Sequence, residues 1–241
     1  MKKLILAAAV LSAFAGSLAH AEEANSLTFN ASAVSDYRYR GISQSHRDLA
    51  LQGGADYTNN PTGLYLGTWL STIKWIKDAG GDADMEWDIY GGKRGEIAHG
   101  LSYDVGLLGY IYPSNSLPTS ANTGEVYGQL GYGPAYIKYS YSLTNLFGFA
   151  DSHHSGYLDV GANIDVSHGY TVNLHAGHQN VKGDANSAAS YSDWKLGLSK
   201  DFGVATGAVA VIGTNANEAA YTVNGTFLGR TSLVLSVSKT F

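Results

Sequence analysis

Alternating apolar and polar positions run through most of the chain. In residues 27–33 (LTFNASA) every odd position is apolar and every even one is polar, and the pattern returns in 85–90, 101–107, 135–143 and 158–166. Successive side chains of a β-strand point to opposite faces, so a period of two is typical of strands between an apolar and a polar environment. Helical spacing fits none of these segments. The pattern therefore predicts an all-β protein.

The alternating segments, separated by turn residues, predict about twelve strands, an even number as in single-chain barrels of the bacterial outer membrane. Each strand has roughly the 9–11 residues that cross a bilayer when the strand is tilted. We expect the strands at about 27–40, 49–58, 63–75, 84–93, 100–112, 124–132, 135–143, 156–166, 170–181, 191–201, 203–214 and 230–241.

The connections between these strands alternate in length. The long ones are 41–48, 76–83, 113–123, 144–155, 182–190 and 215–229, and the short ones are 59–62, 94–99, 133–134, 167–169 and 202. In outer-membrane barrels the short turns face the periplasm and the longer loops face outward. The sequence thus predicts a transmembrane antiparallel up-and-down β-barrel in a Gram-negative outer membrane, with both termini periplasmic.

The first residues have the features of an export signal. Lys2 and Lys3 precede a mostly apolar stretch over 4–18, and Ala19-His20-Ala21 offers small residues where a signal peptidase cleaves. The apolar stretch is shorter than the about 20 residues of a transmembrane helix, which disfavours the alternative of an N-terminal anchor. We expect a signal peptide over 1–21 and a single barrel domain over 22–241.

Composition narrows the classes further. Without Lys2 and Lys3 the chain carries 13 basic and 20 acidic residues, a formal net charge of −7, and no basic patch that would bind nucleic acid. The absence of cysteine means that an exported protein must be stabilised by a large core or by the membrane. The mean hydropathy of −0.10 is compatible with a barrel, because only every second strand residue faces lipid.

If the apolar faces meet lipid, the opposite faces line the lumen. Charged side chains there need water or partners. We interpret them either as a conduit whose field orients small polar or charged solutes, or as ion pairs that plug the barrel. The excess of acids predicts a mild preference for cations. The predicted lumen charges are Asp36, Asp56, Glu86, Asp88, Asp104, Glu125, Asp159, Asp165 and Asp193, with Arg38, Arg40, Lys138 and Lys195.

The predicted size leaves both interpretations open. Twelve tilted strands give a backbone radius of about 12 Å, between eight-stranded barrels filled by side chains and open sixteen-stranded porins. In the third strand we expect the leucines at 64, 66 and 70 to face outward, and Tyr65 and Trp69 to face the lumen. Trp75 is expected in an interfacial aromatic girdle, beyond a β-bulge.

The segment 35–45 (SDYRYRGISQS), followed by 49–57 (LALQGGADY) and 63–69 (GLYLGTW), resembles the N-terminal signature of the TorF family, whose members are named as porins. The resemblance implies an outer-membrane barrel of porin type and no particular solute. We interpret Arg38 and Arg40 as ending the first strand on the lumen side, facing Asp56 on the next strand, as part of a constriction. The alternative is a salt-bridge network that closes the barrel seam.

The last predicted strand has an apolar face formed by Leu233, Leu235, Val237 and Phe241. A final amphipathic strand that ends on an aromatic residue is similar to the signal that the barrel-assembly machinery reads in outer-membrane proteins. Lys239 interrupts this face, close enough to the end to reach the membrane interface. Outer-membrane lipid, the assembly machinery and small solutes are thus the expected partners.

No motif in the sequence indicates an enzyme. The sequence has no nucleophile elbow, HExxH segment, phosphate-binding loop or dinucleotide fingerprint, so we expect no enzyme activity, metal or cofactor. His175 and His178 lie three apart on one predicted strand and should point to opposite faces. Passive diffusion of small solutes is the predicted function, and a plugged structural or adhesin-like barrel is the alternative. A soluble β-sandwich would share the alternation.

Overall fold

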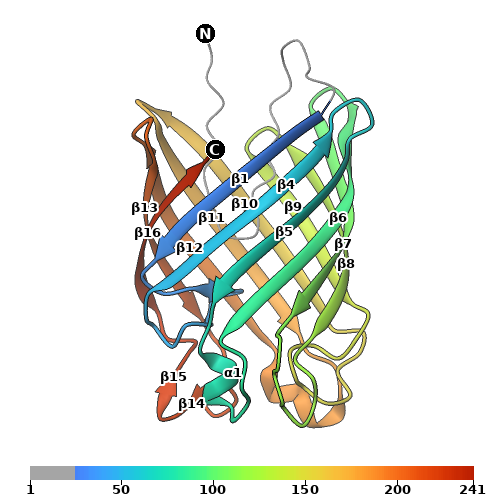
Figure 1. Cartoon of the computed structure of the whole chain (residues 1–241), viewed down its shortest axis with the longest axis vertical. Coiled ribbons are helices and arrows are strands. Elements are labelled where there is room, and N and C mark those ends of the chain that lie inside the picture. The colour runs from blue at the N-terminus through green and yellow to red at the C-terminus, as the bar shows by residue number, and fades with distance from the viewer. Residues whose placement is uncertain (1–24) are drawn as a thin grey trace.

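The computed structural model describes residues 25–241, so the predicted signal peptide lies outside the described residues. Twelve strands form one closed antiparallel barrel (Figure 1), which confirms the predicted fold class and rules out the sandwich. The wall strands are β1 (Asn25–Val34), β4 (Ala50–Asn59), β5 (Leu64–Thr72), β6 (Met85–Ala98), β7 (Leu101–Ile111), β8 (Thr123–Tyr132), β9 (Ala135–Ser142), β10 (Gly156–Ser167), β11 (Tyr170–Asn180), β12 (Tyr191–Asp201), β13 (Thr206–Thr214) and β16 (Ser232–Thr240).

The alternation of apolar and polar residues places apolar side chains on the outer face of this wall and polar side chains on its inner face. Leu27 and Phe29 of β1 are 59% and 52% exposed on the outside, whereas Gln52 of β4 and Ser71 of β5 are buried inside. The leucines of β5 face outward and Tyr65 faces inward, as predicted. An apolar exterior around a polar interior is the reverse of a soluble protein and suits a barrel that is surrounded by lipid.

The barrel closes between its first and last strands. β1 pairs with β4 on one side and β16 on the other, with Ala31 opposite Lys239. The Phe241 N–H donates to the Phe29 carbonyl at 2.8 Å, and the Phe29 N–H donates back at 3.2 Å. Each wall strand thus has a neighbour on both sides, which protects the wall from the addition of a strand by another chain.

Long loops gather at one end of the barrel and short turns at the other (Figure 1), so the predicted alternation of loop length is confirmed. The long-loop end carries α1 (Trp75–Asp78), the 3₁₀-helix η1 (Asp184–Ala189), and a small sheet of β14 (Thr222–Val223) and β15 (Thr226–Phe227). Asn25 and Phe241 lie near the short-turn end. No helix within residues 25–241 is long and apolar enough to cross a membrane.

The first strand ends at Val34, so its predicted extension to residue 40 is wrong. Residues 35–49, which we call the inward loop, leave the wall, and a two-residue strand β2 (Arg38–Tyr39) pairs with β3 (Ile42–Ser43). Arg40 and Gly41, with φ of 48° and 79°, form the tight turn between them. Polar–aromatic alternation continues through this loop and therefore imitates a strand.

The third wall strand ends at Thr72 instead of residue 75. Trp75 begins α1 and packs edge-on against Tyr112, with ring centroids 5.3 Å apart. Both belong to an apolar cluster under the long loops that includes Ile73 and Ile76. The predicted girdle position of Trp75 is thus wrong, because the chain leaves the wall before reaching it.

Candidate functional site

The inward loop crosses the lumen near the long-loop end and is bonded to the wall on several sides. The Tyr37 hydroxyl donates to Glu86 Oε1 on β6 at 2.5 Å. At the tip, Arg40 Nη2 lies 2.8 Å from Glu125 Oε2 on β8, and Nη1 donates to Gln179 Oε1 on β11 at 2.6 Å. Because these strands lie far around the wall from β1, the loop spans the interior and narrows it.

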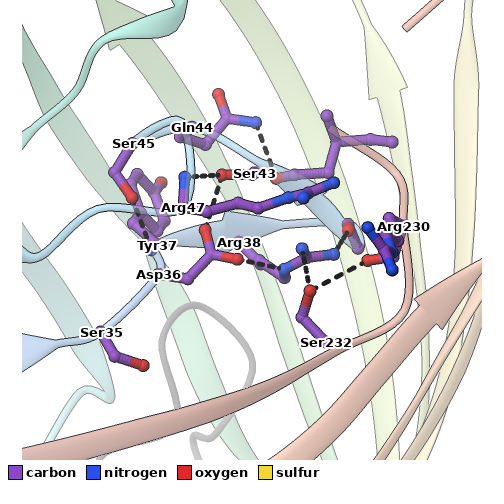
Figure 2. A network of polar contacts seen from close by, with 12 residues as sticks. Ser35, Asp36, Tyr37, Arg38, Ser43, Gln44, Ser45, Arg47, Arg230 and Ser232 are labelled. Atoms are coloured by element: carbon purple, nitrogen blue, oxygen red, sulfur yellow. Dashed lines mark hydrogen bonds and ion pairs between the residues drawn. The ribbon is translucent and has the colours of Figure 1, made fainter. Parts of the chain in front are cut away.

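A second set of contacts holds the β2–β3 hairpin together (Figure 2). Arg38 Nε donates to Asp36 Oδ2 at 2.7 Å, and the Ser43 hydroxyl donates to Asp36 Oδ1 at 2.6 Å. Arg38 also donates to the Gly41 carbonyl at 2.9 Å and to the Ser232 hydroxyl of β16 at 2.9 Å. The ion pair is buried and hydrogen-bonded on both sides, the condition under which a buried charge pair is tolerated.

The far end of the inward loop is fixed to the outer loops. His46 Nδ1 lies 2.6 Å from Asp78 Oδ2 of α1, and its Nε2 lies 3.0 Å from Thr226 Oγ1 of β15. Lys74 Nζ donates to Asp48 Oδ2 at 2.5 Å, and this bond lowers the pKa of the exposed Asp48 carboxyl. The loop is therefore held at its root, along its length and at its tip.

Gly41 has a second role besides the turn. A Cβ at this position would lie 2.5 Å from Thr214 Cγ2 and 2.7 Å from Asp193 Cβ. The tip of the hairpin therefore rests against β12 and β13 at a distance that only glycine permits.

The predicted pairing of the two arginines with Asp56 is wrong. Asp56 lies opposite Thr28 toward the short-turn end and accepts a hydrogen bond from the Tyr90 hydroxyl at 2.6 Å. Arg38 and Arg40 instead meet Asp36 and Glu125. The physical reason is that the chain leaves the wall after Val34, so strand periodicity no longer determines which residue faces β4.

Aromatic side chains fill the half of the lumen formed by β4–β8. The Tyr65 hydroxyl donates to Asp104 Oδ1 at 2.6 Å and also contacts the Tyr127 hydroxyl. Trp69 packs edge-on against Tyr37, with centroids 5.5 Å apart. Apart from Asp88, the predicted acids of this half are thus hydrogen-bonded to tyrosines or to Arg40.

The carboxylates of two buried acidic residues on β6 differ in their hydrogen bonding. Glu86 accepts hydrogen bonds from the Tyr37 hydroxyl and, at 2.7 Å, from the Tyr112 hydroxyl. Asp88 is fully buried, and neither of its carboxylate oxygens has a hydrogen-bond partner among residues 25–241. Asp88 is therefore the least stabilised of the predicted lumen charges.

The other half of the lumen, formed by β9–β13 and β16, contains a cavity of about 150 Å³ beside the hairpin. It is open because its walls carry small side chains, including Ser140, Gly197, Ser199, Ala208 and Ala210. The predicted residues that line it are Asp36, Arg38, Arg40, Lys138, Asp159, Asp193 and Lys195. Asp165 lies elsewhere: it is exposed near the short turns and accepts a hydrogen bond from Thr171 at 2.8 Å.

Sequence analysis missed the centre of this cavity wall, His175. Its Nδ1 lies 2.9 Å from Asp159 Oδ1, and its Nε2 lies 2.7 Å from Asp193 Oδ1. Ionised carboxylates only accept hydrogen bonds, so both ring nitrogens donate and the ring is an imidazolium. The Tyr157 hydroxyl donates to Asp193 Oδ2 at 2.9 Å, in space left by Gly177.

The predicted opposite orientation of the two histidines is confirmed, because His178 is exposed on the outer face. The same alternation predicts that His175 points into the barrel. This was the feature of the sequence that could have identified it as a lumen residue. Its contact with both carboxylates depends on the strand register, in which Gly177 of β11 stands between Asp159 of β10 and Asp193 of β12.

The closed wall, the apolar exterior and the loop folded into a charged lumen together define a porin-like β-barrel fold. The chain belongs to a bacterial protein family of unknown function, Gcw_chp, which residues 18–241 match. The TorF resemblance stays a prediction.

Two solved structures are similar in fold. The KdgM porin matches with a TM-score of 0.57 at 8% identity, covering 89% of this chain and 98% of that one. The NanC porin matches with a TM-score of 0.55 at 10% identity, covering 88% and 98%. No curated protein sequence matches the chain. At these identities the likeness concerns the fold.

Proposed function

We propose that the protein is an outer-membrane channel of porin type, through which small polar or charged solutes diffuse passively. The observation that carries this proposal is the charged cavity beside the inward loop, inside a closed barrel with an apolar exterior. The loop acts as the constriction, because Arg40 spans the interior to Glu125 and so narrows the passage to the cavity side.

The same wall supports a location in the outer membrane. Exposed leucines such as Leu66 and Leu235 form a surface suited to lipid. By the general arrangement of such barrels, the short turns and both termini face the periplasm, and the long loops with α1 face outward. The final strand, ending on the exposed Phe241, is the segment that we propose the assembly machinery recognises.

The cation preference expected from the count of lumen acids finds little support in the cavity. Glu86, Asp88 and Glu125 lie among the tyrosines and Arg40, away from the open half of the lumen. We therefore propose that selectivity depends on the few charges that line the cavity, and not on the charge of the whole interior.

A plugged barrel is the second candidate, and a specific packing favours it. Ile42 of the hairpin belongs to an apolar cluster with Tyr191, Ala216 and Leu228 under the last long loop. This cluster covers the hairpin from the long-loop side. If the loop never moves, the protein would have a structural or surface-binding role and conduct nothing.

Single-channel conductance separates the two candidates. The mature protein, refolded and inserted into planar bilayers, should give discrete conductance steps. A variant whose residues 37–44 are replaced by a short Gly-Ser linker should give larger steps, since the constriction is gone. A native barrel that inserts correctly but stays silent, while the loop variant conducts, would establish the plugged barrel instead.

A further inference from the structure

The side chains around the cavity carry more positive than negative charge. With His175 as an imidazolium, five cationic side chains line it against three carboxylates. The cationic set is Arg38, Arg40, Lys138, His175 and Lys195, and the anionic set is Asp36, Asp159 and Asp193. The surroundings therefore favour a negatively charged solute.

Ion pairing reduces this excess but keeps its sign, because Arg38 is paired with Asp36 and Arg40 with Glu125 outside the cavity, which leaves three cations against two carboxylates. Asp36 is paired with Arg38, and the two remaining carboxylates of the cavity are joined by His175 between them. Asp193 also accepts the Tyr157 hydroxyl, so both of its oxygens are engaged. A cation that approaches Asp36 or Asp193 would have to displace these donors, whereas an anion would not.

Two ammonium groups, in contrast, are free to bind. Within residues 25–241, neither Lys138 Nζ nor Lys195 Nζ forms a hydrogen bond or ion pair; Lys138 Nζ lies 4.1 Å above the Tyr127 ring. Lys138 of β9 lies opposite Asp159 of the neighbouring β10. Lys195 of β12 lies opposite His175 of the neighbouring β11. The two lysines thus flank the carboxylate–histidine cluster from either side.

We propose that this cavity binds small organic carboxylates between Lys138 and Lys195, and that the channel accordingly favours anions. The proposal rests on the channel function proposed above. Carboxylate oxygens accept charge-assisted hydrogen bonds from ammonium groups, which are the donors that the cavity leaves unused. Ser140, Asn173 and Ser199 add neutral polar groups around the same space. A cavity of about 150 Å³ holds a molecule of the size of benzene, which sets the solute at a few carbon atoms.

Reversal potentials across a KCl gradient test the charge preference. The native channel should favour chloride over potassium, and Lys138→Gln and Lys195→Gln should each lower that permeability ratio about sevenfold. One unit charge at about 7 Å in water changes the energies of chloride and potassium by about RT each, in opposite directions. Lys182→Gln removes an equal charge from an exposed outer loop and should leave the ratio unchanged. Lys138→Arg keeps the positive charge that Lys138→Gln removes and should therefore give the native ratio. This comparison distinguishes a charge effect from misfolding.

Succinate tests the binding site itself. Added to the native channel, succinate should reduce the chloride current in a saturable way, and the double variant K138Q/K195Q should lose this block. A conducting channel that prefers cations, or whose block by succinate survives the double substitution, would overturn the carboxylate site and leave the proposed channel function intact. A silent native barrel would instead refute the channel function.

Discussion

Arg40 and Glu125 form a buried ion pair across the barrel interior, with Nη2 2.8 Å from Oε2 and the side chains 5% and 2% exposed. The Arg40 guanidinium also lies 4.3 Å from the centre of the Tyr157 ring. A loop that begins at the end of β1 is thus fixed to β8 and β10, on the other side of the lumen. These contacts hold the tip of the inward loop against the opposite side of the barrel wall.

Removing Arg40 should therefore both destabilise the barrel and widen its passage. Arg40→Ala leaves the Glu125 carboxylate buried without its partner, a loss of about 3–5 kcal/mol in buried pairs. Urea unfolding in detergent micelles measures the stability, and single-channel recording measures the step size. The double variant R40A/E125A should recover part of the lost stability, because it removes the isolated charge. Equal losses for the single and double variants would contradict a direct pairing.

Gly41 offers a test of how closely the hairpin tip approaches the wall. Gly41→Ala meets Thr214 and Asp193 below van der Waals distance and also places alanine at a positive φ, which by itself costs about 1–2 kcal/mol. Gly133→Ala has the same backbone requirement, with φ of 56°, but no atom lies within 4 Å of the added Cβ. The first variant should lower the unfolding midpoint in urea clearly more than the second. Indistinguishable midpoints would mean that the tip is not pressed against β12 and β13.

The wall of this barrel could be predicted from sequence because lipid and water impose a strict period of two on it. β10 and β11, for example, begin where the alternation of 156–166 and 170–181 predicts. The inward loop could not be predicted, because residues 35–40 (SDYRYR) keep the same alternation after the chain has left the wall. The signal that was available is Gly41, because a tight hairpin turn with positive φ angles favours glycine.

The candidate site was predictable only in part, for a related reason. Alternation identifies which side chains face inward, and it placed Lys138, Asp159 and Lys195 there. It does not tell which half of the lumen they share, because that depends on how twelve strands close and on which residues are bulky. Tyr65 and Tyr127 fill one half, while Gly197 and Ala208 leave the other half open.

The two acids of β6 should respond in opposite ways to neutral substitution. Glu86→Gln disturbs hydrogen bonds from Tyr37 and Tyr112 and should lower the free energy of unfolding by about 1–3 kcal/mol. Asp88→Asn removes a buried charge that has no partner among residues 25–241, so stability should be kept or increased. Urea titrations of both variants under identical micelle conditions compare them. A large loss of stability in Asp88→Asn would show that this carboxylate is held by a group still to be identified.

His175 provides the sharpest test of the cavity, because the same strand supplies its control. His175→Ala removes one positive charge and its hydrogen bonds to Asp159 and Asp193, so the cavity should shift toward cations. The chloride-to-potassium permeability ratio should fall about sevenfold or more. His178→Ala removes an imidazole that points away from the lumen and should leave the ratio as it is. Reversal potentials of the two variants, each checked for barrel formation by circular dichroism, give the comparison. If His175→Ala folds and conducts with the native ratio, the ions do not pass this histidine and the permeation path must lie elsewhere in the lumen.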